Sequence, residues 1–186
     1  MLILIERCEP SSGKSSSRSA ARVEQLAEGV VSVEWGLAGV AEETARVHLH
    51  VGDRTKPPVD LAFDERDGRL VGVQVVLQDE AVSEQYVFGD GLVCQYGVPI
   101  ADLTPWREEE QILDHVFAPT IAWEPVGTLA VRVARTAGLP TKECVIDGVR
   151  LVLDERRLLV GIRLTGFSEL EIAAVARAAA GSLHDP

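Results

Sequence analysis

The sequence predicts an α+β fold: one domain with a mostly antiparallel sheet and two to three helices packed against it. Apolar and polar residues alternate over many short segments that turn residues separate, which is typical of strands. One strand–turn–strand pattern occurs twice, as LAFDERDGRLVGVQV at residues 61–75 and LVLDERRLLVGIRL at 151–164. Apolar residues at helical spacing in other segments predict the helices. A duplicated β-sandwich or a small barrel is the alternative.

The repeated pattern predicts a β-hairpin in each half of the chain. Both copies place an Asp-Glu-Arg turn between two apolar strands, and the second strand carries a Val-Gly step. A further strand-like segment precedes each copy, at 46–51 and 128–134. We therefore expect a single domain over residues 1–186 that contains two pseudo-repeated strand-loop-hairpin halves, roughly residues 30–98 and 123–180.

A short apolar strand at 2–5 and a Ser-rich loop at 9–19, which we expect to be mobile, precede the first half. Residues 20–27 carry apolar side chains at helical spacing after Ser19, a favourable N-cap, and predict a first helix. The strands predicted next lie at 30–35, 46–51, 59–63, 70–77, 84–88 and 92–96.

A helix is predicted between the two halves, at 104–117. A Thr-Pro pair and three glutamates open this segment, and Pro119 follows its end. Strands are expected at 128–134, 143–146, 149–153 and 158–164. The last element is the clearest helix, because Ser168 and Glu171 have the spacing of a capping box before an Ala-rich run.

Charge and hydropathy exclude several classes of function. The chain has 29 acidic and 18 basic residues, a formal charge of −11, and no basic cluster, so we expect no nucleic-acid binding. No apolar run approaches the roughly 18 residues that cross a bilayer, and the N-terminus has no signal-peptide pattern, so we expect a cytoplasmic protein without membrane contact. Only 3 of the 18 basic residues are lysines, which is typical of GC-rich bacterial genomes.

The three cysteines predict no disulfide framework. Cys8, Cys94 and Cys144 are odd in number and widely spaced, and no Cys-x-x-Cys pair occurs. We expect them to be reduced thiols, most of them in the core.

His48 and His50 form the best candidate for a metal site. Residues two apart on a strand point to the same face, so both imidazoles could coordinate one divalent ion. Asp53, Asp60 and His115 are candidate third ligands, and their spacing selects none of them. The competing interpretation is two histidines on the solvent face of a strand, with no cofactor.

The His48-Leu49-His50 sequence resembles the His-x-His motif of the cupin family. That resemblance implies a small metal-dependent enzyme, in which a Glu a few residues later and a more distant His complete the site. The positions that follow His50 here include Asp53 and Arg54 but no Glu, and the second cupin motif is not found after Gly97.

The segment around Trp106 is the candidate surface for a protein partner. If exposed, Trp106 and Arg107 beside Glu108, Glu109 and Glu110 would form a hot spot for protein binding. If buried, Trp106 would attach its segment to the sheet, which is the usual role of Trp.

The sequence therefore favours a non-enzymatic, acidic protein-binding module of bacterial type, for example an immunity or inhibitor-like protein with a basic partner. No coherent set of catalytic residues stands out. The alternative is the small metal-dependent, cupin-like enzyme that uses His48 and His50. We expect a monomer or a homodimer, the latter joined through an exposed sheet edge.

Overall fold

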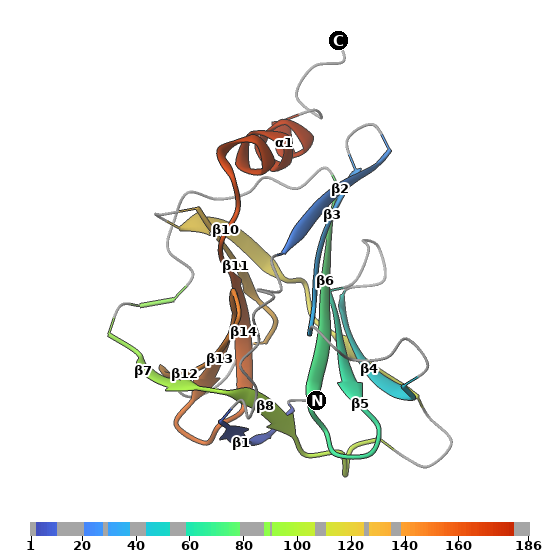
Figure 1. Cartoon of the computed structure of the whole chain (residues 1–186), viewed down its shortest axis with the longest axis vertical. Coiled ribbons are helices and arrows are strands. Elements are labelled where there is room, and N and C mark those ends of the chain that lie inside the picture. Colours follow the sequence, from blue (N-terminus) through green and yellow to red (C-terminus); the bar gives the residue numbers. More distant parts are fainter. Residues whose placement is uncertain are drawn as a thin grey trace.

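The fold is described from a computed structural model, which defines residues 3–10, 21–27, 30–37, 44–52, 59–78, 88–89, 91–106, 111–124, 127–134 and 139–180. Within these ranges the chain forms fourteen strands and one helix (Figure 1). The first eight strands are β1 (Ile5–Glu9), β2 (Arg22–Ala27), β3 (Val30–Gly36), β4 (Arg46–Gly52), β5 (Val59–Asp64), β6 (Leu70–Gln78), β7 (Val93–Tyr96) and β8 (Val98–Ala101). The remaining elements are β9 (Ile112–Val116), β10 (Thr120–Glu124), β11 (Thr128–Arg132), β12 (Pro140–Ile146), β13 (Val149–Asp154), β14 (Leu159–Leu164) and α1 (Glu169–Ala180).

Two six-stranded sheets share one strand order. The first sheet runs β2-β3-β6-β5-β4-β9 and the second runs β10-β11-β14-β13-β12-β7. Neighbouring strands are antiparallel except at one edge of each sheet, where β9 pairs parallel with β4 and β7 pairs parallel with β12. Although β7 lies inside the predicted first half, it belongs to the second sheet.

The two repeated hairpins occupy corresponding places in the two sheets. Gly72 on β6 pairs with Ala62 on β5, and Gly161 on β14 pairs with Val152 on β13. Each pairing is followed by an irregularity in the register at the same point. Because register fixes which side chains share a face, corresponding positions of the two sheets can be compared one by one.

The two sheets enclose the core between their inner faces (Figure 1). A single cluster of buried apolar side chains contains residues of both sheets, including Leu49 and Phe63 from the first and Leu151 and Ile162 from the second. The Trp35 indole donates to the Asp147 carbonyl at 2.9 Å and connects the first sheet to the β12–β13 turn. Alternate residues of each strand consequently face outward.

The ends of the core are covered by different elements. Strands β1 and β8 form a two-stranded antiparallel sheet, and their ends bridge to the hairpin turns of both large sheets, at Leu158 and Arg69. At the other end, α1 contacts β2, β3 and β6, and its Val175 is fully buried. The predicted capping box is confirmed, since the Glu171 amide donates to Ser168 Oγ and the Ser168 amide to Glu171 Oε2.

The predicted α+β class is wrong, because the described chain is nearly all strand, in antiparallel and mixed sheets. Of the predicted helices, residues 20–27 include β2, which pairs with β3. The expected helix at 104–117 is a turn at 104–106 followed by β9. In both cases pairing with a neighbouring strand supplies the backbone hydrogen bonds that a helix would have made internally. Most of the Ser-rich loop expected at 9–19 lies outside the described residues.

The cysteines also differ from expectation. Cys8 on β1 and Cys144 on β12 form a disulfide, and Cys94 on β7 is an exposed free thiol. The sequence could not predict the pair, since the two residues are 136 positions apart. No helix in the described ranges is long and apolar enough to cross a membrane.

Candidate functional site on the outer face of the first sheet

Strand alternation places two histidines on the outer face of the first sheet. On β4, Val47, Leu49 and Val51 are buried in the core, whereas His48 and His50 alternate with them and point outward. This outcome agrees with the prediction that the two imidazoles share a face. Their side chains are 31% and 30% exposed, so they remain within reach of solvent.

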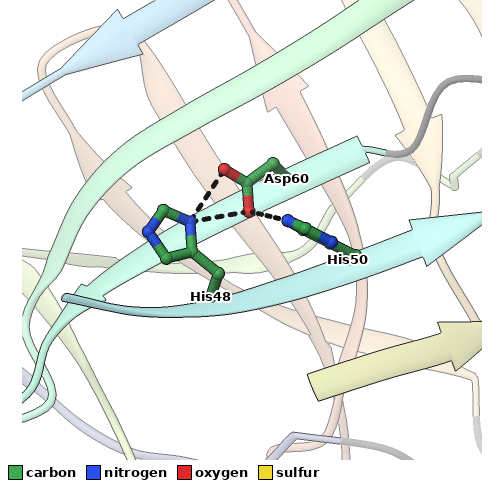
Figure 2. A group of neighbouring side chains, drawn as sticks. All are labelled: His48, His50 and Asp60. Atoms are coloured by element: carbon green, nitrogen blue, oxygen red, sulfur yellow. Dashed lines mark hydrogen bonds and ion pairs between the residues drawn. The ribbon is translucent and has the colours of Figure 1, made fainter. Parts of the chain in front are cut away.

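Both histidines approach one carboxylate, that of Asp60 on the neighbouring strand β5 (Figure 2). His50 and Asp60 are directly paired across the two strands. His48 Nδ1 lies 3.0 Å and 3.1 Å from the two Asp60 oxygens, and His50 Nε2 lies 3.4 Å from Asp60 Oδ1. One ligand atom from each of the three residues can be chosen so that all lie within 4.8 Å of one another.

A second carboxylate approaches the opposite side of the His50 ring. Asp114 on β9 pairs with His50 in the parallel ladder, and its Oδ1 lies 3.6 Å from His50 Nδ1. The row Asp60–His50–Asp114 therefore crosses three adjacent strands, with a carboxylate facing each ring nitrogen of His50.

Trp106 holds this part of β4 from inside. Its indole donates to the His48 carbonyl at 3.1 Å, and its ring packs on Phe63 at 5.8 Å between centroids. Trp106 is only 9% exposed, so it takes the buried role that the sequence left open. Arg107, Glu108, Glu109 and Glu110 lie outside the described residues, and their role in partner binding stays a prediction.

A shallow pocket of about 190 Å³ lies beside His48. Ala62 and Gly72 lie at its floor, and polar side chains form its rim: Glu34, Arg46, His48, Asp60 and Gln74. Glu34 accepts hydrogen bonds from Gln74 at 2.7 Å and from Ser32 at 3.1 Å. Arg46 Nε is buried and has no hydrogen-bond partner among the described residues.

The corresponding place on the second sheet is covered by the chain itself. The Phe88 ring lies against Gly161, the position that matches Gly72, and a Cβ added at Gly161 would overlap this ring. Phe88 packs with Ala130, Val152 and Val160 in a separate apolar cluster on the outer side of the sheet. Phe88 is 2% exposed, so this face is closed.

Charged side chains surround Phe88 on the second sheet. Arg163, at the position that matches Gln74, forms ion pairs with Glu124 and Glu143 and donates to the Phe88 carbonyl at 3.3 Å. Its guanidinium carbon lies 5.4 Å from the centre of the Phe88 ring. Burial alone would lower the pKa of Arg163, but its hydrogen bonds to the two glutamates outweigh this effect and raise it.

The matching positions Gly72 and Gly161 therefore have different surroundings in the two sheets. On the second sheet a glycine supports an aromatic ring from another segment, with arginines beside it. On the first sheet the matching Gly72 opens into a pocket. Among the described residues, a Cβ there would meet only Ala62 Cβ at 3.6 Å and the Trp35 carbonyl oxygen at 3.7 Å.

Sequence reasoning identified part of this site. Of the three candidate third ligands, Asp60 lies beside both histidines, Asp53 lies outside the described residues, and His115 stacks on Phe117 at 6.1 Å. Burial lowers the pKa of His115, with a nearby positive charge as the smaller cause. Asp114 and the Gly72 pocket were missed, because only the pairing of β4 with β5 and β9 brings them to the histidines.

Comparisons with known proteins give no family for this chain. No protein-family model matches the sequence, and no curated protein is significantly similar to it.

Proposed function

We propose that this protein is a non-enzymatic binding module that binds a segment of another protein on the outer face of its first sheet. An aromatic side chain of that segment would lie over Gly72, as Phe88 lies over Gly161. The contact between Phe88 and Gly161 carries the proposal, because it shows what this position of the fold accommodates.

The size and surroundings of the pocket support an aromatic occupant. A cavity of about 150 Å³ holds one benzene ring, and the pocket beside Gly72 has about 190 Å³. Aromatic anchors in pockets are typical centres of protein interfaces. The rim carries polar side chains for hydrogen bonds to the partner's backbone, including the Glu34 carboxylate as an acceptor.

The charge of the chain favours a basic partner. The formal charge is −11, and Glu34 and Asp60 lie at the rim of the pocket itself. An acidic surface accelerates encounter with a basic protein and suits an immunity or inhibitor-like role of bacterial type. We propose that the module acts as a monomer or a homodimer.

A displayed library of random heptapeptides tests the proposal on the full chain. We expect the selected peptides to contain Phe, Tyr or Trp together with Lys or Arg. Gly72→Leu fills the pocket and should weaken their binding by about tenfold or more, the loss expected when an interface anchor is removed. Val76→Leu is the matched control, since it introduces the same side chain on the same strand outside the pocket lining.

Two outcomes contradict the proposal. Selected peptides without aromatic residues would show that the pocket takes something else. Equal binding of aromatic peptides to the wild type and to Gly72→Leu would place their contact elsewhere on the surface. Thermal unfolding of both variants checks that each has kept the wild-type fold.

We also propose a cytoplasmic location, and the Cys8–Cys144 disulfide provides its test. Disulfides persist mainly in oxidising compartments and are rare in the cytosol. Thiols trapped by an alkylating agent during lysis should number three per chain if the protein is reduced in cells. A single trapped thiol, at Cys94, would contradict the cytoplasmic proposal.

A further inference from the structure

We propose that His48, His50 and Asp60 bind a divalent transition-metal ion, with Zn²⁺ as the expected occupant. The ligand atoms are His48 Nδ1, His50 Nε2 and a carboxylate oxygen of Asp60. This site borders the proposed aromatic pocket, because His48 and Asp60 also line that pocket. It assigns no enzymatic activity to the chain.

The ligand atoms already have separations that fit one ion. Zinc binds imidazole nitrogen and carboxylate oxygen at about 2.0–2.2 Å, so two ligands of a tetrahedral site lie about 3.3 Å apart. The two imidazole nitrogens lie 3.0 Å and 3.4 Å from the nearest Asp60 oxygens. The two imidazole nitrogens lie within 4.8 Å of each other, so an ion between the three groups requires rotations that draw the side chains in Figure 2 closer together.

Asp114 supplies a second, separate observation. A histidine that binds metal through one ring nitrogen typically donates its other N–H to a carboxylate, which fixes the tautomer and the ring orientation. If His50 Nε2 binds the ion, its Nδ1 carries the proton, and Asp114 Oδ1 lies 3.6 Å from that nitrogen. This distance is longer than a hydrogen bond, so the exposed Asp114 side chain would have to move slightly closer to support His50 as a metal ligand.

Paired strands hold the ligands in register. His48 and His50 lie on β4 between β5 and β9, and the Trp106 indole anchors the His48 carbonyl. Sites built on strands keep their geometry better than sites on loops. The Asp60 side chain is 20% exposed, and the His48 and His50 side chains are 31% and 30% exposed. One side of the cluster is therefore open to water, which would serve as the fourth ligand.

The chemistry of the donors selects the class of ion. Mg²⁺ and Ca²⁺ prefer sites made of oxygen ligands, whereas two imidazole nitrogens suit zinc and its transition-metal neighbours. Among these ions, a site of nitrogen and oxygen ligands binds Mn²⁺ more weakly than Zn²⁺. We therefore expect Zn²⁺ to bind more tightly than Mn²⁺, and Mg²⁺ to show no saturable binding.

Calorimetric titration of the full chain with Zn²⁺, after treatment with a chelator and its removal, tests the site. We expect one ion per chain. Histidine NMR signals recorded during the titration should shift for two of the four histidines. The double substitution His48→Ala/His50→Ala should abolish saturable binding, and Asp60→Asn should weaken it strongly.

His115→Ala is the matched control, because it removes another histidine from the same sheet without touching the cluster. It should leave Zn²⁺ affinity unchanged. Asp114→Asn should weaken binding by about 10- to 100-fold while one ion still binds, as expected of a residue that acts through a ligand. A carboxylate without this role would leave the affinity unchanged.

The wild-type titration alone can overturn the proposal. If Zn²⁺ does not saturate, or if the shifted signals belong to His115 and His184, the cluster is only a hydrogen-bonded group. Binding that survives in the double variant would likewise place the ion elsewhere. Because neither result depends on aromatic peptides, failure of this site is distinguishable from failure of the proposed function.

Discussion

At the scale of single residues, Gly72 and Gly161 occupy matching positions with opposite surroundings. Gly161→Ala would drive a Cβ into the Phe88 ring and the Val131 carbonyl oxygen, whereas Gly72→Ala would make ordinary contacts. We expect the first substitution to lower the free energy of unfolding by about 1–3 kcal/mol. The second should be neutral or stabilising by up to about 1 kcal/mol. Urea unfolding of both variants measures this difference, and equal effects would contradict it.

The Cys94 thiol is predicted to react slowly despite its exposure. Burial of the sulfur and its interaction with Glu143 raise its pKa, so less thiolate is present at a given pH. Alkylation by iodoacetamide, followed by mass spectrometry across pH, should show a midpoint above that of glutathione. With Cys8 and Cys144 joined, Cys94 is the thiol that remains to react. A midpoint below that of glutathione would show that the nearby arginines dominate instead.

The residues of the site show where sequence reasoning succeeded and where it stopped. The two-residue spacing of His48 and His50 was enough to place both on one face, because that follows from strand geometry alone. The choice of Asp60 and the approach of Asp114 depend on which residues are opposite each other in β4, β5 and β9. The register between strands depends on how the whole sheet pairs, so the spacing of residues within one strand does not predict it.

At the scale of elements, β9 is a strand in a segment whose sequence pattern predicted a helix. The segment 104–117 has a helix-like beginning, and its apolar residues fit a helix as well as an edge strand. Its backbone instead pairs with β4, with the His48 amide donating to the Gln111 carbonyl and the Phe117 amide to the Gly52 carbonyl. Tertiary pairing outweighed local preference here, whereas α1 formed as predicted because its capping box and Ala-rich run agree.

The Cys8–Cys144 disulfide is expected to stabilise the junction between β1 and β12. It closes a loop across 136 residues, and disulfides that close long loops remove much freedom from the unfolded chain. Cys8→Ser should lower the free energy of unfolding by about 2–4 kcal/mol. Thermal unfolding with and without reductant measures it, and Cys94→Ser is the control, expected to change little. A Cys8→Ser variant as stable as the oxidised wild type would refute this role.

At the scale of the whole molecule, the charge of −11 should control the rate of partner association. Opposite charges steer encounter, and salt screens them over a Debye length of about 8 Å at physiological ionic strength. Basic aromatic peptides from the library should therefore associate faster at low salt, with dissociation changing much less. Stopped-flow fluorescence at several salt concentrations measures both rates. An association rate indifferent to salt would exclude electrostatic steering.

The overall architecture was only partly predictable. The repeated Asp-Glu-Arg pattern predicted a hairpin in each half, and β5–β6 and β13–β14 form these hairpins, because turn residues and alternation are local signals. The division into two sheets was not predicted. The sequence did not reveal that β7 and β9 would cross to opposite sheets, since β7 is a four-residue strand and β9 a five-residue strand, both at sheet edges. It also missed that Phe88 would cover one sheet, which depends on packing between distant segments.

The exchange of the edge strands β7 and β9 between the two sheets has a consequence for how the protein unfolds. The first sheet is complete only with β9, and the second only with β7, although β7 precedes β9 in the chain. A single cut anywhere between residues 97 and 111 would leave each fragment with a strand that belongs to the other. Each sheet therefore depends on a strand supplied by the other half of the chain. We expect the two sheets to unfold together, as a single transition in differential scanning calorimetry.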